Sequence, residues 1–239
     1  MRPESRWRIL LIAEGPTDRR RIGVIVDHLI EGHAKGELQA DARPVFEGLN
    51  GEAYIPIKRI PELARARGLD RRYSPAGPRK GDGGTLRKAH QVLQKEGLFT
   101  ADRVIVWARD DDGDQDRRKD AEEARGTLPE EPRVLLAIAS ECGEAWSIAG
   151  FSPATPAEAA KLKAWRQRLG FAPQEQPHRL SHKENVPKSA KAVTADLFDG
   201  DDEREAAALI AAAGSGGPAS QTSGLQAFCD EVRAWLIRG

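Results

Sequence analysis

The stretch from Val104 to Asp114 limits the possible folds of this chain more than any other part of the sequence. It reads VIVWARDDDGD, so an apolar run rich in β-branched residues ends abruptly in carboxylates and a glycine. A short apolar run bounded by turn residues is typical of a buried strand in a parallel sheet. In open α/β sheets, ligands bind beyond the carboxyl ends of such strands. The sequence therefore predicts an α/β fold with acidic side chains at its ligand-binding edge.

The aspartates of this stretch allow two interpretations. Like charges a few ångströms apart disfavour joint ionisation, and a bound divalent cation such as Mg²⁺, which prefers oxygen ligands, removes that repulsion. Alternatively, the run is a solvated acidic turn that opens the charged helix expected over 114–125. An isolated acidic turn would favour the second interpretation, because short motifs often match by chance.

Two further apolar runs also end in acid. Residues 8–13 lead into Glu14 and Gly15, and residues 133–139 lead into a segment that contains Glu141 and Glu144. Glu14 on its own could simply satisfy the N–H groups at the start of the next helix. However, the carboxyl ends of parallel strands share one edge of a sheet, so three acid-tipped strands favour a common metal site.

The patterns in the rest of the chain predict an α/β core followed by a helical extension. An amphipathic helix is expected after Gly15, and a strand over 43–49, where Pro44 argues for an edge or an early position. A short extended piece is expected within 53–60 and a helix over 85–97. Beyond residue 150 the strand signals stop. Helices are expected over 157–169, 187–198, 204–213 and 225–237, with a Gly/Ser turn region over 214–224. We therefore expect an α/β core over 1–150 and a helical extension over 151–239 that packs on it.

A basic segment precedes the central strand. Residues 65–88 hold eight Lys or Arg against two Asp, and their prolines and glycines indicate a loop. Such a loop is a plausible contact for a phosphate backbone, although an ordinary solvated Arg-rich loop has the same composition. The candidate nucleic-acid-binding residues are Arg71, Arg72, Arg79 and Lys80.

Composition excludes several other classes. The 239-residue chain has a formal net charge of zero, so any nucleic-acid contact must use a local patch. The apolar runs are too short to span a bilayer, and the charged N-terminus has no signal-peptide pattern. Cys142 and Cys229 form no metal or redox spacing, and His178 and His182 lack a third ligand and are expected at the surface. We expect a soluble cytoplasmic protein with no membrane partner.

The order of these motifs resembles the TOPRIM domain of topoisomerases, primases and OLD-family nucleases. That pattern is a Glu-Gly after the first strand, here Glu14-Gly15, followed by Asp-x-Asp after a later strand. Asp110 and Asp112 match it best because they lie closest to the strand end, although Asp112 and Asp114 fit the same spacing. The stretch from Glu14 to Asp18 is similar to OLD-like proteins. Glu144-Ala145-Trp146 and Pro187-Lys188 resemble a small TOPRIM-like family that often accompanies ATPases in bacterial defence or mobile loci.

The resemblance implies a TOPRIM-like, mostly parallel sheet with helices on both faces, and a helical C-terminal region. It also implies Mg²⁺ or Mn²⁺ held by Asp110, Asp112 and Glu14, with Glu14 credited with acid–base work. Glu144, or less favourably Glu141, would supply a further carboxylate. The implied catalytic residues are thus Glu14, Asp110, Asp112 and Glu144, and the implied reaction is hydrolysis of DNA or RNA phosphodiester bonds by an antiviral effector.

Three alternatives remain open at this point. The first is a TOPRIM-like subunit that binds nucleic acid, nucleotide or a partner protein without cutting. The second is another Mg²⁺-dependent enzyme, such as a phosphatase or phosphoacceptor, because acidic strand ends serve those chemistries too. The third is a structural subunit of an ATPase complex.

Overall fold

The computed structural model describes residues 7–34, 43–69, 81–100 and 102–237, and its centre is a parallel sheet of five strands. The strands are β1 (Arg8–Ala13), β2 (Val45–Glu47), β3 (Ile55–Pro56), β4 (Arg103–Asp110) and β5 (Val134–Ala139). Their order is β2-β1-β4-β5, and β3 pairs with β1 beyond the end of β2. All of these pairings are parallel. The predicted α/β class with a mostly parallel sheet is confirmed, and so is the edge position of the strand within 43–49.

The register of the strands brings their carboxyl ends to one edge. Ile12 of β1 pairs with Trp107 of β4, and Asp110 of β4 pairs with Ala139 of β5. The residues that follow β1, β4 and β5 therefore leave the sheet side by side. This common edge is the structural basis of the candidate site.

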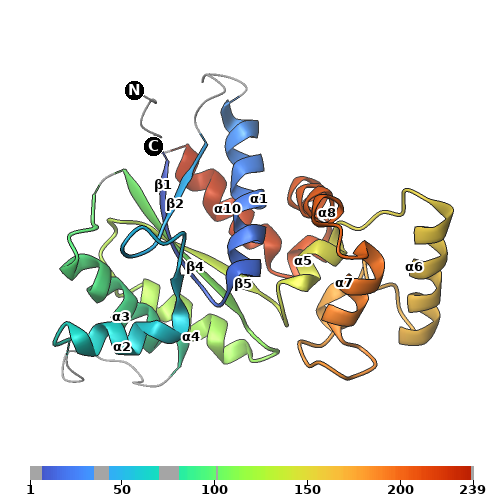
Figure 1. Ribbon diagram of the computed structural model, residues 1–239, viewed down its shortest axis with the longest axis horizontal. Helices are drawn as coiled ribbons and strands as arrows, with labels where there is room; N and C mark the ends of the chain where they lie inside the picture. The colour runs from blue at the N-terminus through green and yellow to red at the C-terminus, as the bar shows by residue number, and fades with distance from the viewer. Residues whose placement is uncertain (1–6, 35–42, 70–80, 101, 238–239) are drawn as a thin grey trace.

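Helices cover both faces of the sheet, as Figure 1 shows. Side chains alternate across a strand, so Ile9 and Leu11 pack on one face while Leu10 and Ile12 pack on the other. The first face is covered by α1 (Pro16–Ala34) and α10 (Leu225–Leu236). The second is covered by α2 (Ile60–Ala66), α3 (Asp82–Lys95) and α4 (Gln115–Arg125). The 3₁₀ turn η1 (Ile57–Arg59) leads into α2.

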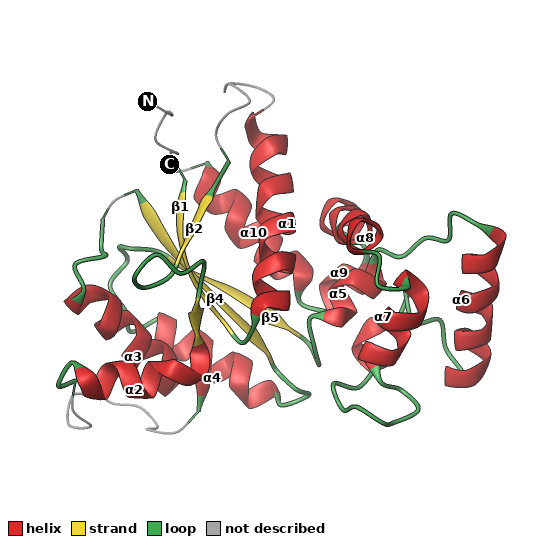
Figure 2. Cartoon of the chain, in the orientation of Figure 1, coloured by secondary structure: helices red, strands yellow, loops and turns green. Residues whose placement is uncertain are grey.

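The remaining helices form a lobe beside the sheet (Figure 2). They are α5 (Glu144–Ala149), α6 (Pro156–Leu169), α7 (Ala190–Phe198), α8 (Asp202–Ser215) and α9 (Pro218–Thr222), with the 3₁₀ turn η2 (Pro177–Arg179). The lobe has its own apolar core, in which Phe151 meets Phe198 edge to face. Leu209 of α8 and Phe228 of α10 instead belong to the core under the sheet. The chain after residue 150 thus builds a second core and also completes the first. None of the described helices is long and apolar enough to cross a membrane.

Two differences from the sequence prediction have a clear physical reason. Helix α3 begins at Asp82 and not at Thr85, because Gly83 packs directly on α4, where a Cβ atom would lie 2.3 Å from the carbonyl oxygen of Asp120. Gly83, one of the glycines that suggest a loop, is therefore needed for close packing of α3 on α4. The expected turn region over 214–224 contains the short helix α9, which begins at Pro218, a favourable first position for a helix.

A buried histidine in α3 leads to a first prediction. His90 is buried, its ring meets Phe99 edge to face with the ring centroids 4.5 Å apart, and no described residue forms a hydrogen bond with its Nε2. Burial lowers the pKa of His90 in the folded protein. Below about pH 6.5 the unfolded chain therefore binds a proton at His90, whereas the folded chain does not yet bind one. Stability from this position is therefore lost as the pH falls. We expect His90→Leu to gain stability over the wild type as pH falls from 7 to 5, measured by urea denaturation. The same change at the exposed His178 should show no such trend.

Candidate metal centre at the sheet edge

The first strand and helix supply two carboxylates. Strand β1 ends at Ala13, and Glu14 and Gly15 form the turn into α1. The Gly15 N–H donates to Asp18 Oδ2 at 3.0 Å, which fixes Asp18 in the first helical turn, where the helix dipole favours a negative charge. Glu14 lies at the rim and its Oε1 accepts a weak hydrogen bond from the Asp110 N–H at 3.4 Å. The turn thus presents the exposed Glu14 and the half-buried Asp18 to the end of β4.

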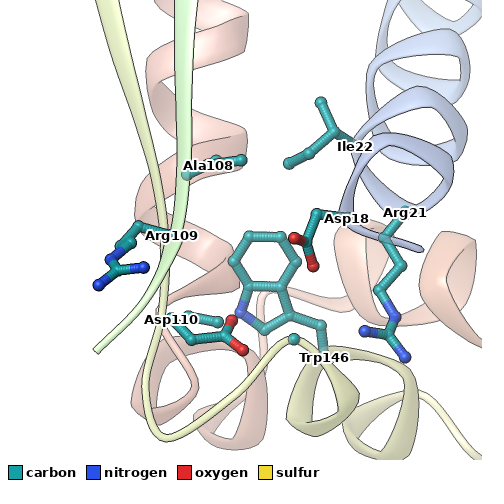
Figure 3. Close-up of a pocket in the computed structure, with 10 residues that line it drawn as sticks. Asp18, Arg21, Ile22, Ala108, Arg109, Asp110 and Trp146 are labelled. Atoms are coloured by element: carbon teal, nitrogen blue, oxygen red, sulfur yellow. The ribbon is translucent and has the colours of Figure 1, made fainter. Parts of the chain in front are cut away.

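Asp110 is the last residue of β4 and points toward α1. Figure 3 shows its carboxyl group and that of Asp18 turned toward the same cavity, while the neighbouring Arg109 points away from it. The cavity encloses about 10 Å³, close to the space that one water molecule needs, and Arg21, Gly143 and Trp146 complete its lining. The half-buried Asp110 therefore borders a small, partly open cavity at the sheet edge.

The electrostatics of Asp110 set it apart from the other acids. Burial is the largest effect, and together with the charges of Asp18, Glu14 and Glu144 it raises the pKa of the Asp110 carboxyl to about 8, against a lowering by Arg21. Burial also raises the pKa of Asp18, with Glu14 and Glu144 adding to it. We call these four residues, Glu14, Asp18, Asp110 and Glu144, the carboxylate cluster.

Helix α5 supplies the fourth carboxylate, Glu144. Arg21 links this carboxylate to Glu205 in the C-terminal lobe. Glu144 is the first residue of α5, and its Oε1 accepts from Arg21 Nη2 at 3.2 Å. Arg21 Nε also donates to Glu205 Oε1 of α8 at 3.0 Å, and Ser147 Oγ donates to the same oxygen at 2.7 Å. Burial alone would lower the pKa of Arg21, but Glu144 and Glu205 outweigh it and raise that pKa. The guanidinium is thus a permanent charge between two acids.

A second arginine meets the cluster from the other face of the sheet. Arg109 Nη1 donates to Glu14 Oε1 at 2.5 Å, and Arg109 Nε donates to Asp82 Oδ2 at 3.1 Å. Burial alone would lower the pKa of Arg109, but Glu14 and Asp82 outweigh it and raise that pKa. The cluster is therefore flanked by two fixed positive charges.

The aspartates after Asp110 have other contacts. Asp111 is buried, and its Oδ1 accepts from the N–H groups of Gly113 at 2.9 Å and Glu141 at 2.7 Å, which links the two turns. Asp112 has a positive φ of 53° and pairs with Arg117. Asp114 caps α4. The structure thus brings only Asp110 of this run into the cluster.

The structure brings some, but not all, of the sequence-predicted site residues together. The structure brings together Glu14, Asp110 and Glu144, whereas Glu141 lies 3.3 Å from His182 Nδ1. Arg71, Arg72, Arg79 and Lys80 lie outside the described residues. Sequence reasoning assigned no role to Asp18 or Arg21, although both lie one turn apart in the helix after Glu14. Glu205 gave no sequence signal, because only the fold brings α8 to Arg21.

The donor set fits a hard divalent cation in its chemistry. All four side chains of the cluster offer oxygen, which Mg²⁺ and Mn²⁺ prefer, and their mutual repulsion is what a cation would relieve. Over the described ranges, however, no three acid, histidine or cysteine side chains already converge on one point that could hold an ion. The ion pairs with Arg21 and Arg109 hold Glu144 and Glu14 in their present positions, so metal binding would require rotation of these side chains.

Comparison with known proteins adds no family assignment. No protein-family model matches the chain, and neither a curated protein nor a solved structure matches it.

Proposed function

We propose that this protein is a divalent-metal-dependent phosphodiesterase that hydrolyses nucleic acid, with Mg²⁺ or Mn²⁺ at the carboxylate cluster. The observation that supports this most is the convergence of acids from the ends of three parallel strands on one edge of the sheet. Ligands bind at this edge in open α/β sheets. A purely solvated acidic turn would not need to hold a half-buried Asp110 close to three other acids.

In this proposal each residue of the cluster has its own role. Asp110, Glu144 and Asp18 would hold the cation from the enclosed side, and Glu14 would join them from the exposed rim. Such a cation polarises a phosphoryl oxygen and lowers the pKa of bound water when it is present. Glu14, as the most exposed of the four, is placed to accept a proton from an attacking water. Asp112 would take part only after leaving Arg117.

A second candidate function is a binding subunit without catalysis. The observation that favours it is that Arg21 and Arg109 form ion pairs with Glu144 and Glu14, two of the four acids of the cluster. Such a protein would bind nucleic acid or a partner, and the sequence resemblance suggests an ATPase in a bacterial defence locus. The two candidates differ in whether the cluster binds metal at all.

Metal titration of matched variants separates the two candidates. Mn²⁺ and Mg²⁺ binding would be measured by calorimetry for the wild type, Asp110→Asn and Asp112→Asn. We expect Asp110→Asn to weaken Mn²⁺ binding by at least about tenfold, which is about 1.4 kcal/mol, because it removes the central oxygen charge. Asp112→Asn makes the same charge change two residues away and should alter affinity far less, since Asp112 pairs with Arg117.

Cleavage assays then test the reaction itself. Wild-type protein with Mn²⁺ should cut at least one of a panel of single- and double-stranded DNA and RNA substrates, and Asp110→Asn should not. If the wild type binds no metal, the non-catalytic candidate takes precedence.

A further inference from the structure

Arg109 pairs with two acids that come from different parts of the fold. It stands one residue before Asp110 on β4, and its guanidinium joins the exposed Glu14 to the buried Asp82 at the start of α3. The Glu14 side chain is 37% exposed, whereas that of Asp82 is only 10% exposed. An ion pair with an exposed partner contributes little to stability, so the bond to Glu14 can be exchanged while the bond to Asp82 holds the side chain in place.

The hydrogen-bonding capacity of Arg109 is only partly used. A guanidinium carries five N–H donors in a planar fork, a geometry that suits phosphate. Nε donates to Asp82 and Nη1 donates to Glu14. Within the described part of the chain, no group accepts a hydrogen bond from Nη2. Opening the Glu14 pair would leave the two Nη groups available together on the rim of the cluster.

We propose that Arg109 is the phosphate-binding residue of this site, held by Glu14 until Glu14 turns to the metal. This inference rests on the proposed metal-dependent function and names the group that would recognise the phosphodiester. If the cluster held a cation, the Glu14 carboxylate would turn toward it and away from the Arg109 guanidinium. The guanidinium, anchored by Asp82, then faces the rim and binds a phosphate oxygen. Metal and phosphate therefore each favour binding of the other.

The inference makes two predictions of opposite sign for one substitution. Arg109→Gln removes a positive charge that competes with the metal for Glu14, so Mn²⁺ alone should bind about two- to fivefold tighter, as measured by calorimetry. The same variant loses the phosphate contact, so a fluorescent oligonucleotide at saturating Mn²⁺ should bind at least about tenfold more weakly. KM for a small phosphodiester such as bis(p-nitrophenyl) phosphate should rise correspondingly.

Matched variants make the result specific to this side chain. Lys119→Gln removes one positive charge from the neighbouring helix α4, where Lys119 pairs with the exposed Glu123, so both affinities should stay near the wild-type values. Arg109→Lys keeps the charge but loses the fork. This variant should leave the Mn²⁺ affinity unchanged and still weaken oligonucleotide binding. It also replaces Arg109→Gln in the test if that variant does not fold.

Failure of the inference can be distinguished from failure of the proposed function. If the wild type binds Mn²⁺ and cuts nucleic acid while neither Arg109 variant changes oligonucleotide affinity, Arg109 is a structural partner of Glu14 and the inference is wrong. The same holds if Arg109→Gln weakens Mn²⁺ binding. If the wild type binds no Mn²⁺, both the inference and the proposed metal site are overturned.

Discussion

Replacing Asp110 with asparagine is expected to stabilise the metal-free protein, and to do so more strongly at pH 8 than at pH 5. The pKa of Asp110 is raised to about 8 in the folded protein, whereas an unfolded aspartate titrates near 3.8. Between these values the folded state holds a proton that the unfolded state has released. Stability of the wild type therefore falls as pH rises from about 4 to about 8, and an asparagine removes this loss.

The size of the effect should be easy to measure. One pKa unit corresponds to about 1.4 kcal/mol, and we expect a gain of about 1–3 kcal/mol at pH 8 after relaxation of the surrounding carboxylates. For a chain of this length each kcal/mol raises Tm by about 2–4 °C. Thermal unfolding in the presence of a chelator, at a series of pH values, gives the curve directly.

Asp112 provides the control for this measurement. Asp112→Asn breaks a partly exposed ion pair with Arg117, so it should leave stability unchanged or slightly lower at every pH. Addition of Mn²⁺ should reverse the order of wild type and Asp110→Asn, because a ligand stabilises only the protein that binds it. A loss of stability in Asp110→Asn at pH 8 without metal would mean that the Asp110 carboxylate is well paired in the folded state.

The sheet could be predicted from the sequence because its three central strands are short, continuous apolar runs. Strands β1, β4 and β5 are buried on both faces, so their sequences are continuously apolar and do not alternate with polar residues. Each apolar run ends where polar residues begin. The start of α3 was missed because Gly83 signals a loop in isolation. Its role is to let α3 approach the backbone of α4, which is a property of the fold and not of the local sequence.

In the candidate site, too, the sequence predicts some residues and misses others. Glu14, Asp110 and Glu144 were predicted to meet because strand topology alone brings their backbone positions together. Asp112 was expected beside Asp110, but the backbone turns after the strand, with a positive φ at Asp112 itself, and this turn directs its carboxylate to Arg117. Local spacing cannot show such a turn. Nor can it show that Glu205, from a helix 61 residues after Glu144, reaches the same arginine.

Removing Glu205 is expected to be the most destabilising of the substitutions considered for this protein. Its side chain is 7% exposed and contacts Arg20, Arg21 and Ser147. Burial alone would raise the pKa of Glu205, but Arg21, Ser147 and Arg20 outweigh it and lower that pKa. Breaking a buried pair leaves an uncompensated charge, which typically costs about 3–5 kcal/mol. We therefore expect Glu205→Leu to lower the free energy of unfolding by about that amount in urea denaturation.

Two comparisons test whether the buried charge is the cause. Glu203→Leu lies on the same helix at an exposed position and should change stability by no more than about 0.5 kcal/mol. The double variant Arg21→Met with Glu205→Leu removes both charges of the pair, so its loss should be clearly smaller than the sum of the two single losses. Additive losses would show that the two side chains are not coupled. A measured coupling would show that α8, in the C-terminal lobe, stabilises Arg21, the same arginine that pairs with Glu144 at the sheet edge.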